Sequence, residues 1–305
     1  MESTEKQVCS SSVRLQCLEA VKVQAWSENM QKTKGDCLAD GYVSSLPEEV
    51  HVELKQNDLT ELAKLWEQVS GPNKRKFCDQ YGQIASLMAV KVDEALIRAA
   101  IQFWDPSYRC FTFNGEDMMP TIEEYSMMIR LDLQSPDKVY YRRTRMGIRK
   151  KLAKMMKIKP EEVDGYLVSK EGSVGLEWDF LRNFISGHIN DDQGLATLAL
   201  TIYGLIIFPR VIGHVEVTVI DFFEQVQNHT NPSSAIVAET FRSLNVCRRK
   251  SGERSWDAFH CYMCGFEAIF TVKKVHSQNL IFLAACQSKN FVIVNGPDRK
   301  QRKDG

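Results

Sequence analysis

An apolar run, LATLALTIYGLIIF from Leu195 to Phe208, constrains the fold of this chain more than any other segment. As a helix it is too short to cross a bilayer, which needs about 20 residues. Pro209 ends the run, and Asp191 or Asp192 can cap its start. A helix that is apolar on every side must be covered by other elements. The run therefore predicts a buried core helix.

Composition narrows the class of protein without naming a function. The chain has 305 residues, of which 44% are hydrophobic and 26% charged, as is usual for a globular protein with a sizeable core. Thirty-nine basic residues balance thirty-nine acidic ones, so affinity for nucleic acid or membranes has to come from a local patch. The N-terminus lacks an apolar run of signal-peptide length, and nine cysteines are scattered along the chain. We expect reduced thiols in an intracellular, nuclear or cytoplasmic protein.

Helical periodicity recurs along the chain and predicts a mainly α fold, a single helical domain over residues 25–250 with a small β-hairpin element near 109–113. Residues 1–24 are expected to form a flexible tail, and 251–305 an atypical, poorly ordered segment. Capping boxes are predicted at Asp58 with Glu61 and at Thr121 with Glu124. The expected helices cover residues 57–69, 92–104, 120–131, 146–159, 160–168, 176–188, 214–229 and 232–249.

The stretch AIQFWDPSYRCFTFNGEDMMPTIEEY, residues 100–125, concentrates aromatic side chains and turn residues. Asp105 precedes Pro106, where the α conformation is disfavoured, so the preceding helix should end there. RCFTF is a strand candidate, and NGED has the composition of a turn. Each residue type has a structural use, and no pair of nucleophile and base emerges.

A basic run is the strongest candidate binding site. RRTRMGIRKKLAKMMKIK, residues 142–159, contains nine lysines and arginines and no acid. Helical spacing turns the apolar side chains of Ile148, Leu152, Met155 and Met156 towards the core. A nucleic acid would then contact the remaining side chains in a salt-dependent manner; these are Arg142, Arg143, Arg145, Arg149, Lys150, Lys151, Lys154 and Lys157. The alternative, a solvated helix face balanced by acidic neighbours, carries more weight because the run has no aromatic residue to stack on bases.

Other patterns are weaker. Cys261 and Cys264 have the C-x2-C spacing of a zinc site, to which His276 or Cys286 could add ligands, but a second well-spaced pair is missing. His188 and His214 lie at the ends of expected helices, where a cap or loop position is the usual explanation. The sequence contains no recognisable phosphate-binding loop, catalytic-triad motif or HExxH motif. The Met pairs at 118–119, 127–128 and 155–156 are expected to fill the core. We expect no cofactor, no metal and no small-molecule ligand.

The chain resembles a plant-specific family of unknown function. The segments that carry the resemblance follow one another over about residues 25–249: WSENMQKTKGDCLADGYVSSL, QNDLTELAKLWEQ, FWDPSYRCFTF, MMPTIEEYSMMIRL, LALTIYGLIIFPRVIGHV and AIVAETFRSLNVCRR. That family is related to the plant mobile domain, which is associated with transposons and sometimes labelled aminotransferase-like. The resemblance implies a helical domain of transposon origin, nuclear in some relatives, without established catalytic residues. Nothing in the sequence supports a pyridoxal phosphate site.

The resemblance stops after Arg249. Family members continue with an apolar helical segment, whereas this chain reads RSWDAFHCYMCGFEAIF. When the codons for Ser255 through Cys264 are read one nucleotide earlier, the family pattern is closely restored. We therefore expect residues from about 251 onward to be translated out of frame, which makes the Cys261 and Cys264 pair an accident and argues against zinc. Independent transcripts or peptides with this C-terminus, shared by close relatives, would refute the hypothesis.

Four functions follow from the sequence, in order of preference. The first is a non-enzymatic, transposon-derived protein that binds nucleic acid or chromatin proteins through residues 142–159. The second is a protein-interaction scaffold in which the same helix docks an acidic partner. The third is a truncated relic without selected function, and the last is an enzyme whose site residues are dispersed in the sequence. No membrane association is expected.

Overall fold

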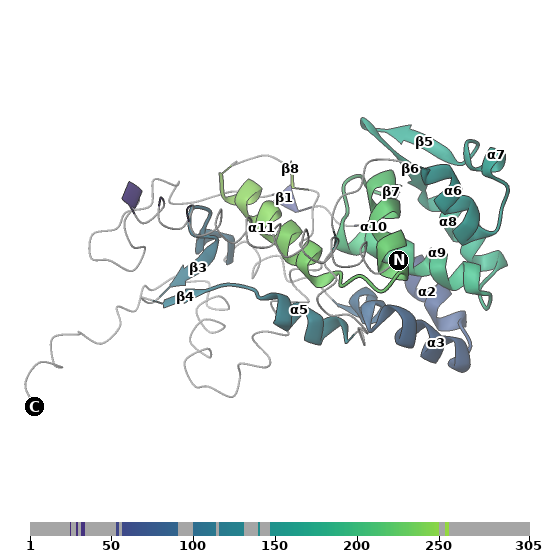
Figure 1. Cartoon of the computed structure of the whole chain (residues 1–305), viewed down its shortest axis with the longest axis horizontal. Helices are drawn as coiled ribbons and strands as arrows, with labels where there is room; N and C mark the ends of the chain where they lie inside the picture. The colour runs from purple at the N-terminus through teal and green to yellow at the C-terminus, as the bar shows by residue number, and fades with distance from the viewer. Residues whose placement is uncertain are drawn as a thin grey trace, which may run out of the picture.

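A computed structural model describes residues 25, 29, 32–33, 53–54, 57–90, 100–113, 116–130, 140, 147–249 and 254–255. Within them the protein is mainly α-helical, with two small three-stranded antiparallel sheets, so the predicted fold class is confirmed (Figure 1). A short parallel pair joins β1 (Glu53–Leu54) to β8 (Arg254–Ser255). The predicted tail at 1–24 lies outside the described residues, as does the segment 251–305 apart from β8.

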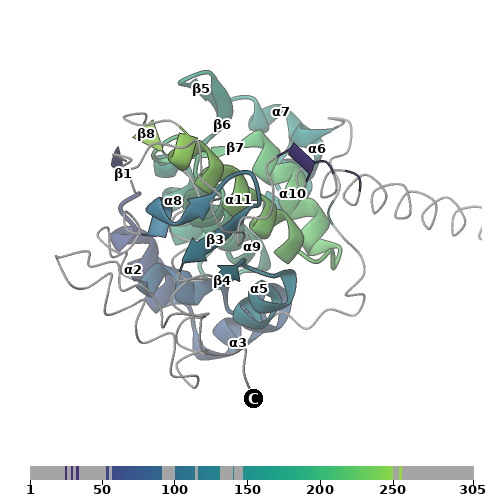
Figure 2. The same ribbon diagram turned by 90° about the vertical axis from the view of Figure 1, so that its left-hand side faces the viewer.

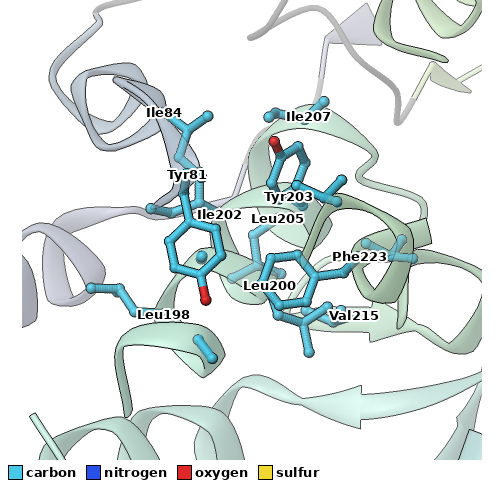
Figure 3. Close-up of a cluster of buried hydrophobic side chains, with 14 of the residues drawn as sticks. Tyr81, Ile84, Leu198, Leu200, Ile202, Tyr203, Leu205, Ile207, Val215 and Phe223 are labelled. Carbon is cyan, nitrogen blue, oxygen red and sulfur yellow. The ribbon is translucent and has the colours of Figure 1, made fainter. Parts of the chain in front are cut away.

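The centre of the fold is the predicted apolar helix. It forms α9 (Asp192–Ile202) and continues as the π-helical segment η2 (Tyr203–Ile207), and every residue from 194 to 207 is buried. Figure 3 shows several of these side chains in the core. Asp191 occupies the N-cap position, but its side chain makes no capping hydrogen bond. Asp192 instead pairs with Lys76, so the predicted N-cap position of Asp191 is confirmed, but neither carboxylate caps the helix through a hydrogen bond. Among the described helices, none is long and apolar enough to cross a membrane.

Helices distant in sequence cover this central helix. α2 (Thr60–Gln68) and α3 (Gly71–Tyr81) lie below it in Figure 1, whereas α6 (Ile148–Met156) and α8 (Trp178–Gly187) lie above. The 3-10 helix η1 (Ile84–Ala89) also packs against it. α10 (Val217–Gln227) brings the ring of Phe223 to 5.6 Å from that of Tyr81 (Figure 3). Burial of these large rings is a main source of hydrophobic stabilisation.

The start of α2 differs from the predicted capping box. Asp58 does accept a hydrogen bond from the Thr60 backbone N–H at 2.9 Å, but the N-cap residue is Leu59. Glu61 does not turn back to the helix start. Its carboxylate accepts hydrogen bonds from Trp178 Nε1 at 3.1 Å and Arg182 Nη1 at 3.0 Å. Glu61 thus connects α2 to α8. Its hydrogen-bond partners are 117 and 121 residues away in the sequence, so the capping-box pattern could not indicate them.

The first sheet was not predicted. It consists of β5 (Leu167–Lys170), β6 (Ser173–Glu177) and β7 (His214–Glu216), in that order. A two-residue turn joins β5 to β6, and both Glu171 and Gly172 have positive φ, at 49° and 75°, as a type I′ hairpin turn requires. Three expected helices are therefore shorter than predicted, since α7 (Pro160–Val163) ends early and α8 and α10 begin only at Trp178 and Val217.

The second sheet contains the predicted strand at 110–113. β3 (Cys110–Phe113) pairs with β4 (Glu116–Met118) and also with β2 (Trp104–Asp105), so the predicted hairpin has a third strand. The preceding helix ends at residue 102, before the predicted stop, because residues 104 and 105 pair with β3. Asp105 Oδ1 accepts the backbone N–H of Ser107 at 2.7 Å. The aromatic and turn residues of the stretch 100–125 therefore build a sheet and its turns, the structural use expected from the sequence.

α5 (Ile122–Ile129) and α11 (Ser233–Arg249) complete this part of the molecule, which faces the viewer in Figure 2. The capping box of Thr121 with Glu124 is confirmed. The hydroxyl groups of Tyr125 and Thr240 lie 2.9 Å apart and join the two helices. The prediction that the Met pairs fill the core is correct for Met156 but wrong for Met127, which is 70% exposed.

Candidate nucleic-acid interface

The predicted basic helix exists as α6 and follows Gly147, whose φ of 86° only glycine adopts readily. Leu152, Ala153 and Met156 are buried, and Ile148 and Met155 are partly buried against the same core. The apolar face is therefore the predicted one, with Ala153 added. This packing fixes the rotation of α6 about its axis, and the rotation determines which of its side chains are exposed to solvent.

Four of the eight candidate residues are exposed on α6 or at its C-terminal cap, namely Arg149, Lys150, Lys154 and Lys157. Three others, Arg142, Arg143 and Arg145, precede Gly147 and lie outside the described residues. The eighth, Lys151, departs from the expectation of an outward-facing side chain, because it is turned towards α10.

Lys151 forms a partly buried charge cluster with two carboxylates of α10. Its Nζ lies 2.5 Å from Asp221 Oδ1 and 2.7 Å from Glu224 Oε2, and the Lys151 and Asp221 side chains are only 14% and 11% exposed. Burial lowers the pKa of Lys151, but hydrogen bonds to Asp221 and Glu224 outweigh that effect and raise it overall. Lys151 therefore holds α6 on α10 and is unavailable to a ligand.

Charge compensation on the rest of the helix is uneven. Arg149 Nε lies 2.7 Å from Asp164 Oδ1, in an exposed pair of the kind worth little energy. Within the part of the chain that the structure describes, no carboxylate lies within ion-pair distance of Lys150, Lys154 or Lys157. The alternative interpretation, a solvated helix face balanced by acidic neighbours, thus holds for Arg149 and Lys151 only.

The first turn of α6 has an unusual charge distribution. It contains Arg149, Lys150 and Lys151 and no acidic residue. The N-terminal end of a helix carries a partial positive charge and favours anions. Arg149 and Lys151 are paired with carboxylates, so Lys150 opposes the helix dipole without an ion-pair partner among the described residues. No side chain caps this end. An anion bound near Arg149 and Lys150 would relieve this repulsion.

The other candidate side chains do not assemble into a site among the described residues. Cys261, Cys264, His276 and Cys286 lie outside them. Over the described residues, no group of His, Cys, Asp and Glu side chains is placed to hold a metal ion. His188 does cap the end of α8, and its Nδ1 lies 3.0 Å from the Phe184 carbonyl oxygen.

His214 was expected at a helix end but lies in β7, where it is only 1% exposed. Neither ring nitrogen has a hydrogen-bond partner among the described residues. Its pKa is lowered by burial and by the charge of Lys170, against the opposing effect of Glu177 and Glu216. The ring is therefore neutral in the folded protein at neutral pH.

We predict that His214 makes the folded protein sensitive to mild acid. Between its lowered folded pKa and the unfolded value near 6.5, the unfolded chain binds more protons, so the free energy of unfolding falls as the pH drops below about 6.5. The slope from one such histidine is at most about 1.4 kcal/mol per pH unit. Urea unfolding at pH 5.0 to 7.5 should show this slope in the parent and a shallower one in His214→Leu. The exposed His229→Asn is the control, and an equal loss of slope there would contradict the assignment.

Comparison with known proteins gives a family but no biochemical activity. Residues 62–273, more than half of the chain, match the family described as a domain of unknown function (DUF7745). No curated protein and no solved structure matches the chain. The kinship with the plant mobile domain and the reading frame after residue 250 both stay hypotheses. On the extent of its match, the chain belongs to the DUF7745 family of unknown function.

Proposed function

We propose that this protein binds the phosphate backbone of nucleic acid, without catalysis, through α6 and the basic residues that precede it. The observation that carries the proposal is the exposed set of Lys150, Lys154 and Lys157, none within ion-pair distance of a described carboxylate, on a helix whose other face is fixed in the core. Their spacing of four and three residues puts them on one side of the helix, over about 10 Å along its axis.

The helix start extends this cationic surface. The first-turn cations Arg149 and Lys150 favour an anionic ligand, as does the positive end of the helix dipole. Arg142, Arg143 and Arg145 lie only two to five residues before Gly147 in the sequence. The resemblance to transposon-derived proteins of the plant nucleus agrees with a nucleic-acid partner.

Binding should depend little on base sequence. The exposed side chains of α6 are lysines and an arginine, and none is aromatic. Lysine contacts to phosphates position a protein on nucleic acid but do not read bases, and stacking on bases needs aromatic rings. A scaffold for an acidic protein partner would use the same lysines, so the experiment has to separate the two partners.

The test is binding of the purified protein to duplex DNA, single-stranded DNA and RNA at 50 to 300 mM salt, followed by fluorescence anisotropy. The triple variant Lys150→Gln, Lys154→Gln, Lys157→Gln should reduce the slope of log K against log salt by about 2 to 3, since each lost phosphate contact removes close to one unit. Lys151 is left intact because its loss would disturb the packing of α6 on α10.

A matched control removes three exposed cations elsewhere, at Lys64, Arg130 and Arg249, and changes the net charge equally. It should leave the slope close to that of the parent. Equal losses in both variants would mean that net charge alone drives binding, and tighter binding to polyglutamate than to nucleic acid would favour the scaffold. Absence of binding in the parent would reject the proposed function.

A further inference from the structure

Two basic helices that are far apart in sequence, α3 and α6, both pack against the central helix α9. α3 and α6 lie on opposite sides of α9 in both views (Figures 1 and 2). Lys76 of α3 lies 2.5 Å from Asp192, in the first turn of α9. The pKa of Asp192 is lowered chiefly by Lys76 and also by the charge of Lys157, at the end of α6. One exposed carboxylate therefore lies within the influence of both lysines.

Hydrogen bonds to the loop before α9 hold the start of α3 in place. The Asn190 side chain accepts the backbone N–H of Ser70 at 3.0 Å, and Asn73 Nδ2 donates to the Asn190 carbonyl at 2.9 Å. Both hydrogen bonds join the start of α3 to the loop just before α9. Arg75 and Lys76 are exposed on the same helix. Lys74 is engaged elsewhere, since its Nζ lies 5.3 Å from the Trp66 ring centroid.

We infer that the nucleic-acid surface of α6 continues past the start of α9 onto Arg75 and Lys76 of α3. The inference rests on the proposed function and extends it to a second, discontinuous segment. Sequence reasoning did not find these residues, because a short basic triplet, Lys74 to Lys76, is common on solvated helices and its neighbour in space is invisible in the sequence.

Asp192 has a defined role on such a surface. In the free protein it pairs with Lys76 and lowers the positive charge at the start of α9. A phosphate that approaches this point displaces the carboxylate from Lys76 and is repelled by it. Removal of the Asp192 charge should therefore strengthen binding, whereas removal of the cations should weaken it. General destabilisation of the fold would weaken binding in both kinds of variant, so opposite changes in affinity point to the charges themselves.

The experiment compares Asp192→Asn with Glu239→Gln, which removes the carboxylate of another ion pair, that of the partly buried Glu239 with the exposed Arg242 on α11. We expect Asp192→Asn to tighten binding to a duplex DNA probe about three- to tenfold at 100 mM salt, as the loss of a like charge within a few Å would do. Glu239→Gln should change it by less than twofold. The double variant Arg75→Gln, Lys76→Gln should lower the salt slope by about 2.

The outcomes distinguish failure of the extension onto α3 from failure of the proposed function. Equal tightening in Asp192→Asn and Glu239→Gln, or an unchanged slope in the Arg75 and Lys76 variant, overturns the continuation onto α3 while leaving α6 as the binding site. If the parent does not bind nucleic acid at all, the proposed function fails and the continuation with it. Circular dichroism of each variant verifies that the fold is intact.

Discussion

Gly194→Ala is expected to lower the free energy of unfolding by about 3 kcal/mol, although alanine is the better helix former by about 1 kcal/mol. A Cβ atom on Gly194, in the first turn of α9, would lie 1.8 Å from the carbonyl oxygen of His188. That oxygen accepts the Asp191 backbone N–H at 2.9 Å, so it cannot move without separating α8 from α9. Urea unfolding monitored by circular dichroism measures the loss.

Gly187→Ala is the matched control, because it also replaces a helical glycine and its new Cβ would meet nothing within 4 Å. We expect it to be neutral or slightly stabilising, since it reduces the freedom of the unfolded chain. If both variants were stabilised by helix propensity, the close approach of α8 to the start of α9 would be refuted.

Lys151→Met is expected to destabilise the protein by about 3 kcal/mol at pH 7. The substitution leaves Asp221 mostly buried without its cation, and breaking such a pair costs far more than losing an exposed one. The adjacent Lys150→Met removes the same charge from an exposed position and should change the free energy of unfolding by less than about 0.5 kcal/mol.

Adding Asp221→Asn to Lys151→Met should restore part of the lost stability, because the remaining carboxylate at that position is removed. Lys151→Met alone also tests whether Lys151 has a structural role or a binding role. At temperatures where this variant is folded, we expect the salt slope of nucleic-acid binding to equal that of the parent. A large change in that slope with little change in stability would place Lys151 on the ligand surface instead.

Local signals in the sequence were sufficient for several elements. Continuous apolarity predicted the buried helix that begins in α9, and a capping box placed the start of α5 at Thr121. Periodicity also gave the buried face of α6 correctly, at Leu152 and Met156. In each case the deciding residues are within about four positions of one another or belong to one run.

The β5–β6–β7 sheet was not predicted, because its strands carry no clear local signal. Its strands have three to five residues, too few for a clear alternation, and they adjoin longer helical patterns that absorbed them. The best available signal was the pair Glu171 and Gly172 between two apolar segments, which suits a hairpin turn. β7 joins the sheet from about forty residues away, which periodicity cannot anticipate.

The sequence by itself determined the class of fold, the central helix and the existence of a basic amphipathic helix, because hydrophobic periodicity and end-capping act within one segment. Only the tertiary structure decided which cations of that helix remain available. Lys151 meets Asp221 across 70 residues, and Lys76 meets Asp192 across 116. Charge compensation depends on distances in space, which packing of the whole chain sets, so the binding surface emerges only when the helices are assembled.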